Sequence, residues 1–359
     1  MRRHSHGQDC LGRCLQPVAR GTAIINAIPV FRATHLVPYI NFCQQHGLPA
    51  NASLRRFKLP TDLAQPEAIY LPRHAGVSAI KDIGERQSIF DLPAQVTSIF
   101  QLSDFGTAID DLVKCSPTLL VALQRLSSAI ALEDSCLKLE ITRKNNITWL
   151  HARQGIDAQF DCDQWSNITL LLLTVRVFAG NDWQPAEVKL ASAPREFALA
   201  QQYFPESRIF WDPSVSGLSI PTDLLSQGRT QGPIQDTLEI DSPSDFEAGP
   251  SFLDTVQGLI AAYLPMGGLS IEQLAEMAEL SSRSLQRRFR ELGLSYSKVQ
   301  DQTRFERAAY LLKNSDSKAL EIALEVGYSD PSHFARSFKR MTNLTPREYR
   351  RQHGHDEIS

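Results

Sequence analysis

Apolar residues near the C-terminus recur at intervals of three and four, the period of an amphipathic helix. Within residues 319–350 this pattern predicts two short helices separated at Gly327, because glycine tolerates the positive φ that ends a helix. The second helix is predicted to begin at Asp330, which suits an N-cap, with Pro331 at the first helical position. The first helix is expected to have an N-cap at Ser317 and to bury Leu320, Ala323, Leu324 and Val326.

The second of these helices has two chemically different faces. Phe334, Phe338 and Met341 fall on one arc at about 100° per residue, and the opposite arc holds Ser332, Arg336, Lys339 and Arg340. A helix that presents basic residues across a tight turn from another helix fits the major groove of DNA. The alternative is an ordinary helical hairpin whose basic face is only solvated.

The same pattern occurs earlier in the chain, within residues 271–292. Ser270 and Gln273 have the spacing of a capping box, and a second helix restarts at Ser281. The apolar arc of that helix holds Leu285, Phe289 and Leu292, and the opposite arc holds Arg283, Gln286, Arg287 and Arg290. Leu285 and Phe334 are equivalent positions 49 residues apart. This repetition favours a duplicated DNA-binding unit over a solvated hairpin.

The stretch from Gly327 to Arg350 resembles, at nearly every position, the signature of the AraC/XylS family of bacterial transcription regulators. The stretch from Leu280 to Phe289 resembles the other helix-turn-helix of that family equally well. One departure is Asn343, where the family usually has glycine, and both residues tolerate the left-handed conformation that ends a helix. The resemblance covers about the last hundred residues.

The resemblance implies which side chains contact DNA. Positions at which the family contacts bases are occupied by Arg283, Gln286, Arg287, Ser332, His333 and Arg336, and Arg290 and Lys339 are expected at phosphates or the groove edge. The chemistry agrees, because arginine can bind guanine and glutamine can bind adenine in bidentate fashion, whereas lysine is a point charge. For each residue the alternative is a solvated surface side chain, and for His333 it is also a local capping role.

The N-terminal pattern alternates between helical and strand-like periods, which predicts one α+β domain over residues 24–226. The predicted elements are helices within 105–132 broken at Pro117, a hairpin of strands 136–142 and 148–151 turning at Asn145, a helix over 170–178, strands over 186–191 and 208–211, and a helix over 194–203 between them. This order faintly resembles the arabinose-binding-type sensing region of one branch of AraC-like regulators.

Residues 227–251 are rich in Gly, Pro, Ser and Asp, which predicts an interdomain linker. An all-α domain with two helix-turn-helix units is expected over 252–353, starting with a helix over 252–264. A long helix over 297–312 joins the two units. Residues 1–23 and 354–359 are expected to be tails.

Composition and charge refine this picture. The 359 residues suffice for two or three domains, and 42% apolar with 21% charged residues is ordinary for a globular protein. The net charge of −3 would argue against nucleic acid, but residues 266–353 hold 15 basic and 11 acidic residues, a balance of +4, which leaves −7 for the rest. The basic surplus lies in the paired helices, as DNA binding requires.

The cysteines, at positions 10, 14, 43, 115, 136 and 162, show no disulfide-framework spacing, which indicates a reducing compartment. No secretory segment or apolar run of about 20 residues is present, so a cytoplasmic protein is expected. His4, His6, Cys10 and Cys14 match no zinc pattern, and widely spaced later cysteines do not suggest a methyl-accepting zinc site. We therefore expect no metal and no cofactor.

Catalytic motifs are also lacking, with no Gly-rich phosphate loop, G-x-S-x-G or H-E-x-x-H sequence. Trp149, Trp165, Trp183 and Trp211 could line a pocket but are expected to be core residues. The chain is therefore expected not to be an enzyme.

The sequence thus predicts a cytoplasmic, sequence-specific DNA-binding transcription regulator whose N-terminal domain is controlled by a small-molecule effector, with no ligand-binding residues assigned. Expected partners are double-stranded promoter or operator DNA, RNA polymerase and a second copy of the chain. The alternative is a ligand-independent regulator whose N-terminal domain only dimerises or binds a protein. An enzymatic N-terminal domain is a further alternative without a catalytic constellation to support it.

Overall fold

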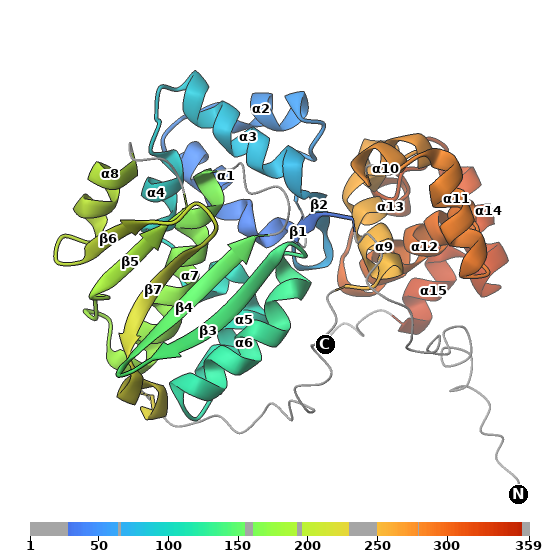
Figure 1. Cartoon of the computed structure of the whole chain (residues 1–359). Helices are drawn as coiled ribbons and strands as arrows, with labels where there is room; N and C mark the ends of the chain where they lie inside the picture. Colours follow the sequence, from blue (N-terminus) through green and yellow to red (C-terminus); the bar gives the residue numbers. More distant parts are fainter. Residues whose placement is uncertain are drawn as a thin grey trace, which may run out of the picture.

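The computed structural model describes residues 28–63, 66–154, 161–191, 196–229, 250–278 and 280–353. A mixed α/β body precedes an all-helical body along the chain, as the sequence predicted (Figure 1). The expected tails, most of the expected linker, and His4, His6, Cys10 and Cys14 lie outside the described residues.

The larger sheet described in the N-terminal body has the strand order β3-β4-β7-β5-β6. Its strands are β3 (Leu137–Lys144), β4 (Ile147–Gln154), β5 (Glu187–Leu190), β6 (Arg208–Trp211) and β7 (Ser216–Pro221). All neighbouring strands are antiparallel except β5 and β6. The predicted hairpin is confirmed, and Asn145 has the positive φ of 56° that its tight turn requires. The strand β7 was not predicted, because Gly217 interrupts its apolar pattern.

Helices cover one face of this sheet and leave the other face open (Figure 1). They include α5 (Thr107–Lys114), α6 (Leu119–Glu133) and α7 (Asp161–Ala179), and the predicted break at Pro117 separates α5 from α6. Of the four tryptophans only Trp165 is fully buried, and Trp211 is 58% exposed on the edge strand β6. The expectation that Trp211 is a core residue is therefore wrong, because the edge strand has no neighbour beyond it.

The chain before residue 105 forms elements that the sequence did not predict. A small ribbon pairs β1 (Val30–Arg32) with β2 (Tyr70–Pro72), and strands of three residues are too short to show a period. The helices of the N-terminal body besides α5 to α7 are α1 (Val37–Gln45), α2 (Ala50–Arg56), α3 (Arg73–Arg86), α4 (Leu92–Thr97) and α8 (Glu196–Tyr203). The helix α8 confirms the one predicted between β5 and β6.

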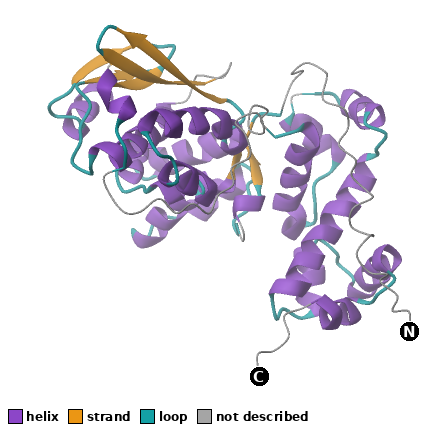
Figure 2. Cartoon of the chain, turned by 90° about the horizontal axis from the view of Figure 1, so that it is seen from below, coloured by secondary structure: helices purple, strands orange, loops and turns teal. Residues whose placement is uncertain are grey.

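The C-terminal body is built from helices alone (Figure 2). They are α9 (Phe252–Tyr263), α10 (Ile271–Met277), α11 (Ser282–Glu291), α12 (Tyr296–Asn314), α13 (Ala319–Glu325), α14 (Pro331–Thr342) and α15 (Pro346–His353). The predicted connecting helix is confirmed as α12, which has 19 residues. At 1.5 Å per residue it is about 28 Å long.

The two bodies meet where β2 packs against α9. The ring of Tyr70 lies so close to Gly258 that a Cβ on that glycine would be 2.4 Å from Cδ2 of Tyr70. The Tyr70 hydroxyl donates a hydrogen bond of 2.8 Å to the Leu132 carbonyl, which limits how far the ring can move. An exposed ion pair between Lys58 and Glu276, 3.8 Å apart, adds little to this contact.

This contact predicts that Gly258→Ala has opposite effects in two contexts. In the full chain the added methyl group overpacks against Tyr70, and we expect a net loss of about 1–3 kcal/mol of unfolding free energy. In a fragment of residues 250–353 the same change should stabilise by up to ~1 kcal/mol, because alanine favours a helix interior more than glycine does. Urea denaturation of both proteins tests this, and an effect of the same sign in both would contradict the packing described.

Candidate nucleic-acid interface

The helix α11 is positioned by its N-cap and its buried face. The Ser281 hydroxyl accepts a hydrogen bond of 3.1 Å from the backbone N–H of Ser284, as its predicted capping role requires. Leu285 and Phe289 are fully buried, and the Phe289 ring lies 5.5 Å from the ring of Phe252 on α9. The opposite side of α11 is therefore turned to solvent.

The helix α14 repeats this arrangement with a stronger cap. The Asp330 carboxylate accepts hydrogen bonds from the backbone N–H groups of Ser332, at 2.9 Å, and His333, at 3.2 Å. These bonds, led by that from Ser332, hold the pKa of Asp330 below its ordinary value. Phe334 and Phe338 are buried, and their ring centroids are 5.7 Å apart. The predicted N-cap Asp330 and the predicted core positions Phe334 and Phe338 are confirmed.

Some positions near the helix ends differ from the prediction. Leu292 and Met341 are exposed rather than buried, because each lies in or beyond the last turn of its helix, where the core no longer follows the arc. The N-cap of α13 is Lys318 and not Ser317. Leu320 and Leu324 are each 53% exposed, since α13 turns Ile322, Ala323 and Val326 inward instead.

All eight predicted DNA contacts are exposed on α11 and α14. They are Arg283, Gln286, Arg287, Arg290, Ser332, His333, Arg336 and Lys339. Both helices lie on the side of the C-terminal body that faces away from the sheet (Figure 1). The offset of 49 residues that relates the N-caps also relates Arg287 to Arg336, and each of these side chains is 70% exposed.

The two central arginines make only weak contacts within the protein. Arg287 Nε lies 3.7 Å from a Glu291 carboxylate oxygen, and Arg336 Nη2 lies 3.8 Å from an Asp330 carboxylate oxygen. Exposed ion pairs at such distances contribute little free energy, so they can be exchanged for other partners. Each guanidinium can therefore reach an external acceptor such as the O6 and N7 atoms of guanine.

His333 and Arg340 are less simply placed. The backbone N–H of His333 takes part in the Asp330 cap, and its ring meets the Tyr328 ring edge-on with centroids 5.3 Å apart. A local role for His333 therefore exists beside its predicted base contact. Arg340 is exposed next to Lys339 but is not among the predicted DNA contacts. Its equivalent in the first unit is the acidic Glu291.

The helix α12 contacts both units, the first through its N-terminal half and the second through its C-terminal half. Toward its N-terminus, the Tyr296 hydroxyl and the Gln300 side-chain amide both donate hydrogen bonds to the Leu269 carbonyl, just before α10. In its second half, Arg307 forms an ion pair of 2.6 Å with Glu325 on α13. The positions of α11 and α14 are therefore coupled through one continuous helix.

The described residues offer neither an arrangement for metal binding nor a helix suited to crossing a membrane. Within them, no group of three or more His, Cys, Asp or Glu side chains is arranged to hold a metal ion. None of the helices described has both the length and the apolar character needed to cross a bilayer.

Comparison with known proteins assigns the C-terminal body. The family model described as a helix-turn-helix domain matches residues 274–352. An uncharacterised HTH-type transcriptional regulator of Haemophilus influenzae is 41% identical over 88 residues, which are 24% of this chain and 30% of that protein. The match thus spans less than a third of the length of this curated relative.

Solved structures of transcriptional regulators are also similar to parts of this chain. A transcriptional regulator from Chromobacterium violaceum, described as having an AraC-type DNA-binding domain, is 30% identical, with 30% of this chain and 94% of that chain covered and a TM-score of 0.27. The transcriptional regulator CdpR from Pseudomonas aeruginosa is 16% identical over 89% of this chain and 98% of that chain, with a TM-score of 0.40. Residues 274–352 are therefore a helix-turn-helix domain similar to those of HTH-type transcriptional regulators.

Proposed function

We propose that this chain is a transcription regulator of the AraC family. It binds a promoter or operator by inserting α11 and α14 into two adjacent major-groove segments of double-stranded DNA. The observation that carries the proposal is the pair of equivalent, capped helices whose exposed basic sides are linked through α12. A recognition helix of this class reads base edges from its N-terminal part. RNA polymerase and a second copy of the chain are further proposed partners in the cytoplasm.

The proposed division of labour follows position along the helices and side-chain chemistry. The proposed base-reading residues are Arg283, Gln286, Arg287, Ser332, His333 and Arg336. Arg290 and Lys339 are equivalent positions in the repeat, later in each helix, and are proposed to contact phosphates or the groove edge. An arginine can discriminate a base by bidentate bonding, whereas a lysine ammonium contributes mainly a charge that any DNA sequence can use.

This division predicts different effects for two substitutions. Arg287→Ala should weaken operator binding by about 1–3 kcal/mol and relax the preference at one base pair, while leaving binding to random DNA nearly unchanged. Lys339→Ala should weaken operator and random DNA to a similar degree and reduce the slope of affinity against salt by about one. Fluorescence anisotropy titrations at several salt concentrations measure both quantities.

The matched control is Arg208→Ala, which removes a positive charge from the exposed side chain on β6. It should leave both affinities unchanged. If Arg287→Ala and Lys339→Ala reduced specific and random binding by the same factor, the separation into base-reading and phosphate contacts would be wrong.

For the N-terminal body we propose control of DNA binding by a small-molecule effector. Two observations support this: the body contains a small cavity lined by polar side chains, and its ribbon of β1 and β2 packs against α9. Isothermal titration of candidate effectors with the full chain tests the proposal, and an effector should change operator affinity as well as bind.

The second candidate is a ligand-independent regulator whose N-terminal body dimerises or binds a protein. The open face and edge of the sheet favour it, because Phe210 and Trp211 on β6 are both exposed. Replacing both residues by Ser should abolish association in sedimentation experiments if this candidate is right, and should leave an effector response intact if it is wrong.

A further inference from the structure

The N-terminal body contains a partly open cavity to which five separate segments contribute polar side chains. They are His35 before α1, Arg73 at the start of α3, Asp134 after α6, Gln154 at the end of β4 and Asn167 on α7. The aromatic rings of Phe31 and Phe105 form part of the wall between them. The space is small: the centres of water-sized molecules can occupy about 40 Å³ of it, room for roughly three waters.

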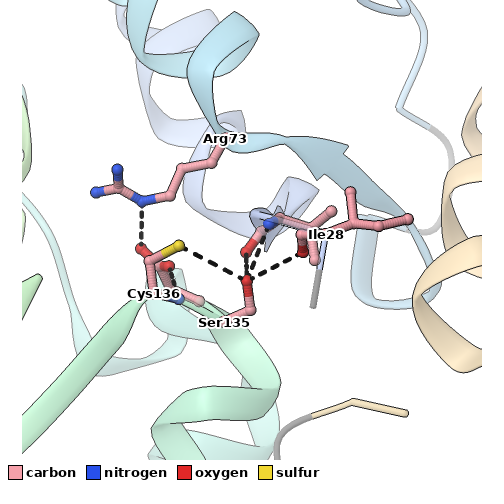
Figure 3. Close-up of polar contacts among 6 residues, drawn as sticks. Ile28, Arg73, Ser135 and Cys136 are labelled. Carbon is pink, nitrogen blue, oxygen red and sulfur yellow. Dashed lines mark hydrogen bonds and ion pairs between the residues drawn. The ribbon is translucent and has the colours of Figure 1, made fainter. Parts of the chain in front are cut away.

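The charged groups in the wall neutralise each other. Arg73 is almost completely buried, and its Nε donates to the Asp134 carboxylate at 3.3 Å (Figure 3). The other Asp134 oxygen accepts a hydrogen bond of 2.8 Å from the Cys136 backbone N–H. The adjacent Ser135 hydroxyl accepts from the Val30 N–H at 3.0 Å, which ties this part of the wall to β1. The wall is therefore held in place and carries no net charge from this pair.

Two buried polar atoms at the cavity have no hydrogen-bond partner in the described part of the chain: Nε2 of His35 and Nε2 of Gln154. A Glu133 carboxylate oxygen, which is also buried and unpaired, lies 3.8 Å from His35 Nε2, beyond hydrogen-bond range. Burial lowers the pKa of His35 to about 4, so its ring is neutral at physiological pH. A neutral imidazole has one nitrogen that donates and one that accepts, and the Gln154 amide nitrogen is a donor.

We propose that this cavity binds a small uncharged molecule that carries hydroxyl or amide groups. Hydroxyl groups both donate and accept, so the polar groups of such a ligand can pair with His35 Nε2 and with the Gln154 amide. An anion or a cation would lose its hydration at a site where Arg73 and Asp134 already neutralise each other, which is costly. The volume suits a ligand of roughly three to six non-hydrogen atoms.

The cavity is connected to the contact between the two bodies. Glu133, next to Asp134, accepts a hydrogen bond of 3.0 Å from Arg32, and the Arg32 guanidinium lies 4.7 Å from the centre of the Tyr70 ring. Tyr70 is the residue that packs on Gly258 of α9. The proposed binding site depends only on the cavity. That a bound ligand changes operator affinity rests in addition on the proposed function.

The test compares probes with one carbon skeleton and different charge. Propane-1,2-diol and lactamide are neutral, lactate is an anion and 1-amino-2-propanol is a cation at neutral pH. At ~0.1 M we expect one or both neutral probes to raise the Tm of the full chain by about 2–4 °C, and the charged probes to give no such shift at matched ionic strength. A shift with lactate or 1-amino-2-propanol equal to that of the neutral probes, or no shift with either neutral probe, would overturn the proposal.

A general solvent effect is separated from binding by Gln154→Leu. This change removes the unpaired amide but keeps a similar volume, so the variant should fold with a Tm at least equal to the original and lose the response to the neutral probes. Gln124→Leu makes the same change at an exposed position on α6 and should retain the response. An unchanged response in Gln154→Leu refutes the site.

Operator affinity is measured separately in the same proteins. If the neutral probe shifts Tm but not operator affinity, the binding site stands and effector control of DNA binding fails. If DNA is bound and no probe binds, the ligand site fails and the DNA-binding proposal stands.

Discussion

Inserting about five base pairs between the two subsites of the operator should abolish specific binding. The insertion rotates one subsite by half a helical turn to the opposite face of the DNA, where a helix held by α12 cannot follow. Specific and non-specific affinities for this type of protein differ by at least ~10³-fold, and the loss should be of that size. Anisotropy titration of the original and altered operators measures it.

An insertion of a full turn, about ten base pairs, serves as the control. It returns the second subsite to the original face of the DNA but roughly doubles the distance between the two subsites, which is about 34 Å in the original operator. The helix α12 is only about 28 Å long and cannot span the doubled distance. Specific binding should therefore stay lost. Recovery with ten base pairs would show that the two units are loosely tethered, and unchanged affinity with five would show that only one unit engages DNA.

Replacing Gly327 by alanine should be the most damaging single methyl addition in the C-terminal body. Gly327 lies between α13 and α14 with a φ of +80°, and a Cβ there would be 2.8 Å from the carbonyl oxygen of Leu264, at the end of the first helix α9. A backbone oxygen cannot move aside as a flexible side chain does. Left-handed strain and the clash together should cost about 2–4 kcal/mol of unfolding free energy and displace α14 relative to α11.

Gly293→Ala is the matched control for this prediction. Gly293 also has a positive φ, +70°, but nothing lies within 4 Å of where its Cβ would be. Its substitution should cost only the left-handed strain, about 1–2 kcal/mol, and leave operator affinity nearly unchanged. Equal losses of stability and affinity in both variants would mean that the contact of the α13–α14 turn with Leu264 does not position the second unit.

The C-terminal fold was predictable because its signals are local. Ser281 and Asp330 each indicate the start of a helix, because a single side chain can cap it. Phe334 and Phe338 are four residues apart, about one helical turn, and so indicate the buried face of α14. The same locality explains the errors at Leu320 and Leu324. The helix α13 has only seven residues, too few positions to fix which side meets the core.

The N-terminal body was predicted only where periods are long enough to be read. The hairpin of β3 and β4 has eight residues in each strand, whereas β1 and β2 have three each and pair across about forty residues of sequence. The cavity could not be predicted at all. His35 and Gln154 are far apart in the chain and come together only through the packing of several elements.

The central claim is that one chain reads DNA with both α11 and α14, and dimethyl sulfate protection of guanine N7 on the isolated operator tests it most directly. The full chain should protect guanines in two major-groove segments about 34 Å apart on one face of the DNA. Arg287→Ala should restore reactivity in one segment only and Arg336→Ala in the other only. Protection of a single segment per chain, or loss of the same segment in both variants, would contradict the claim.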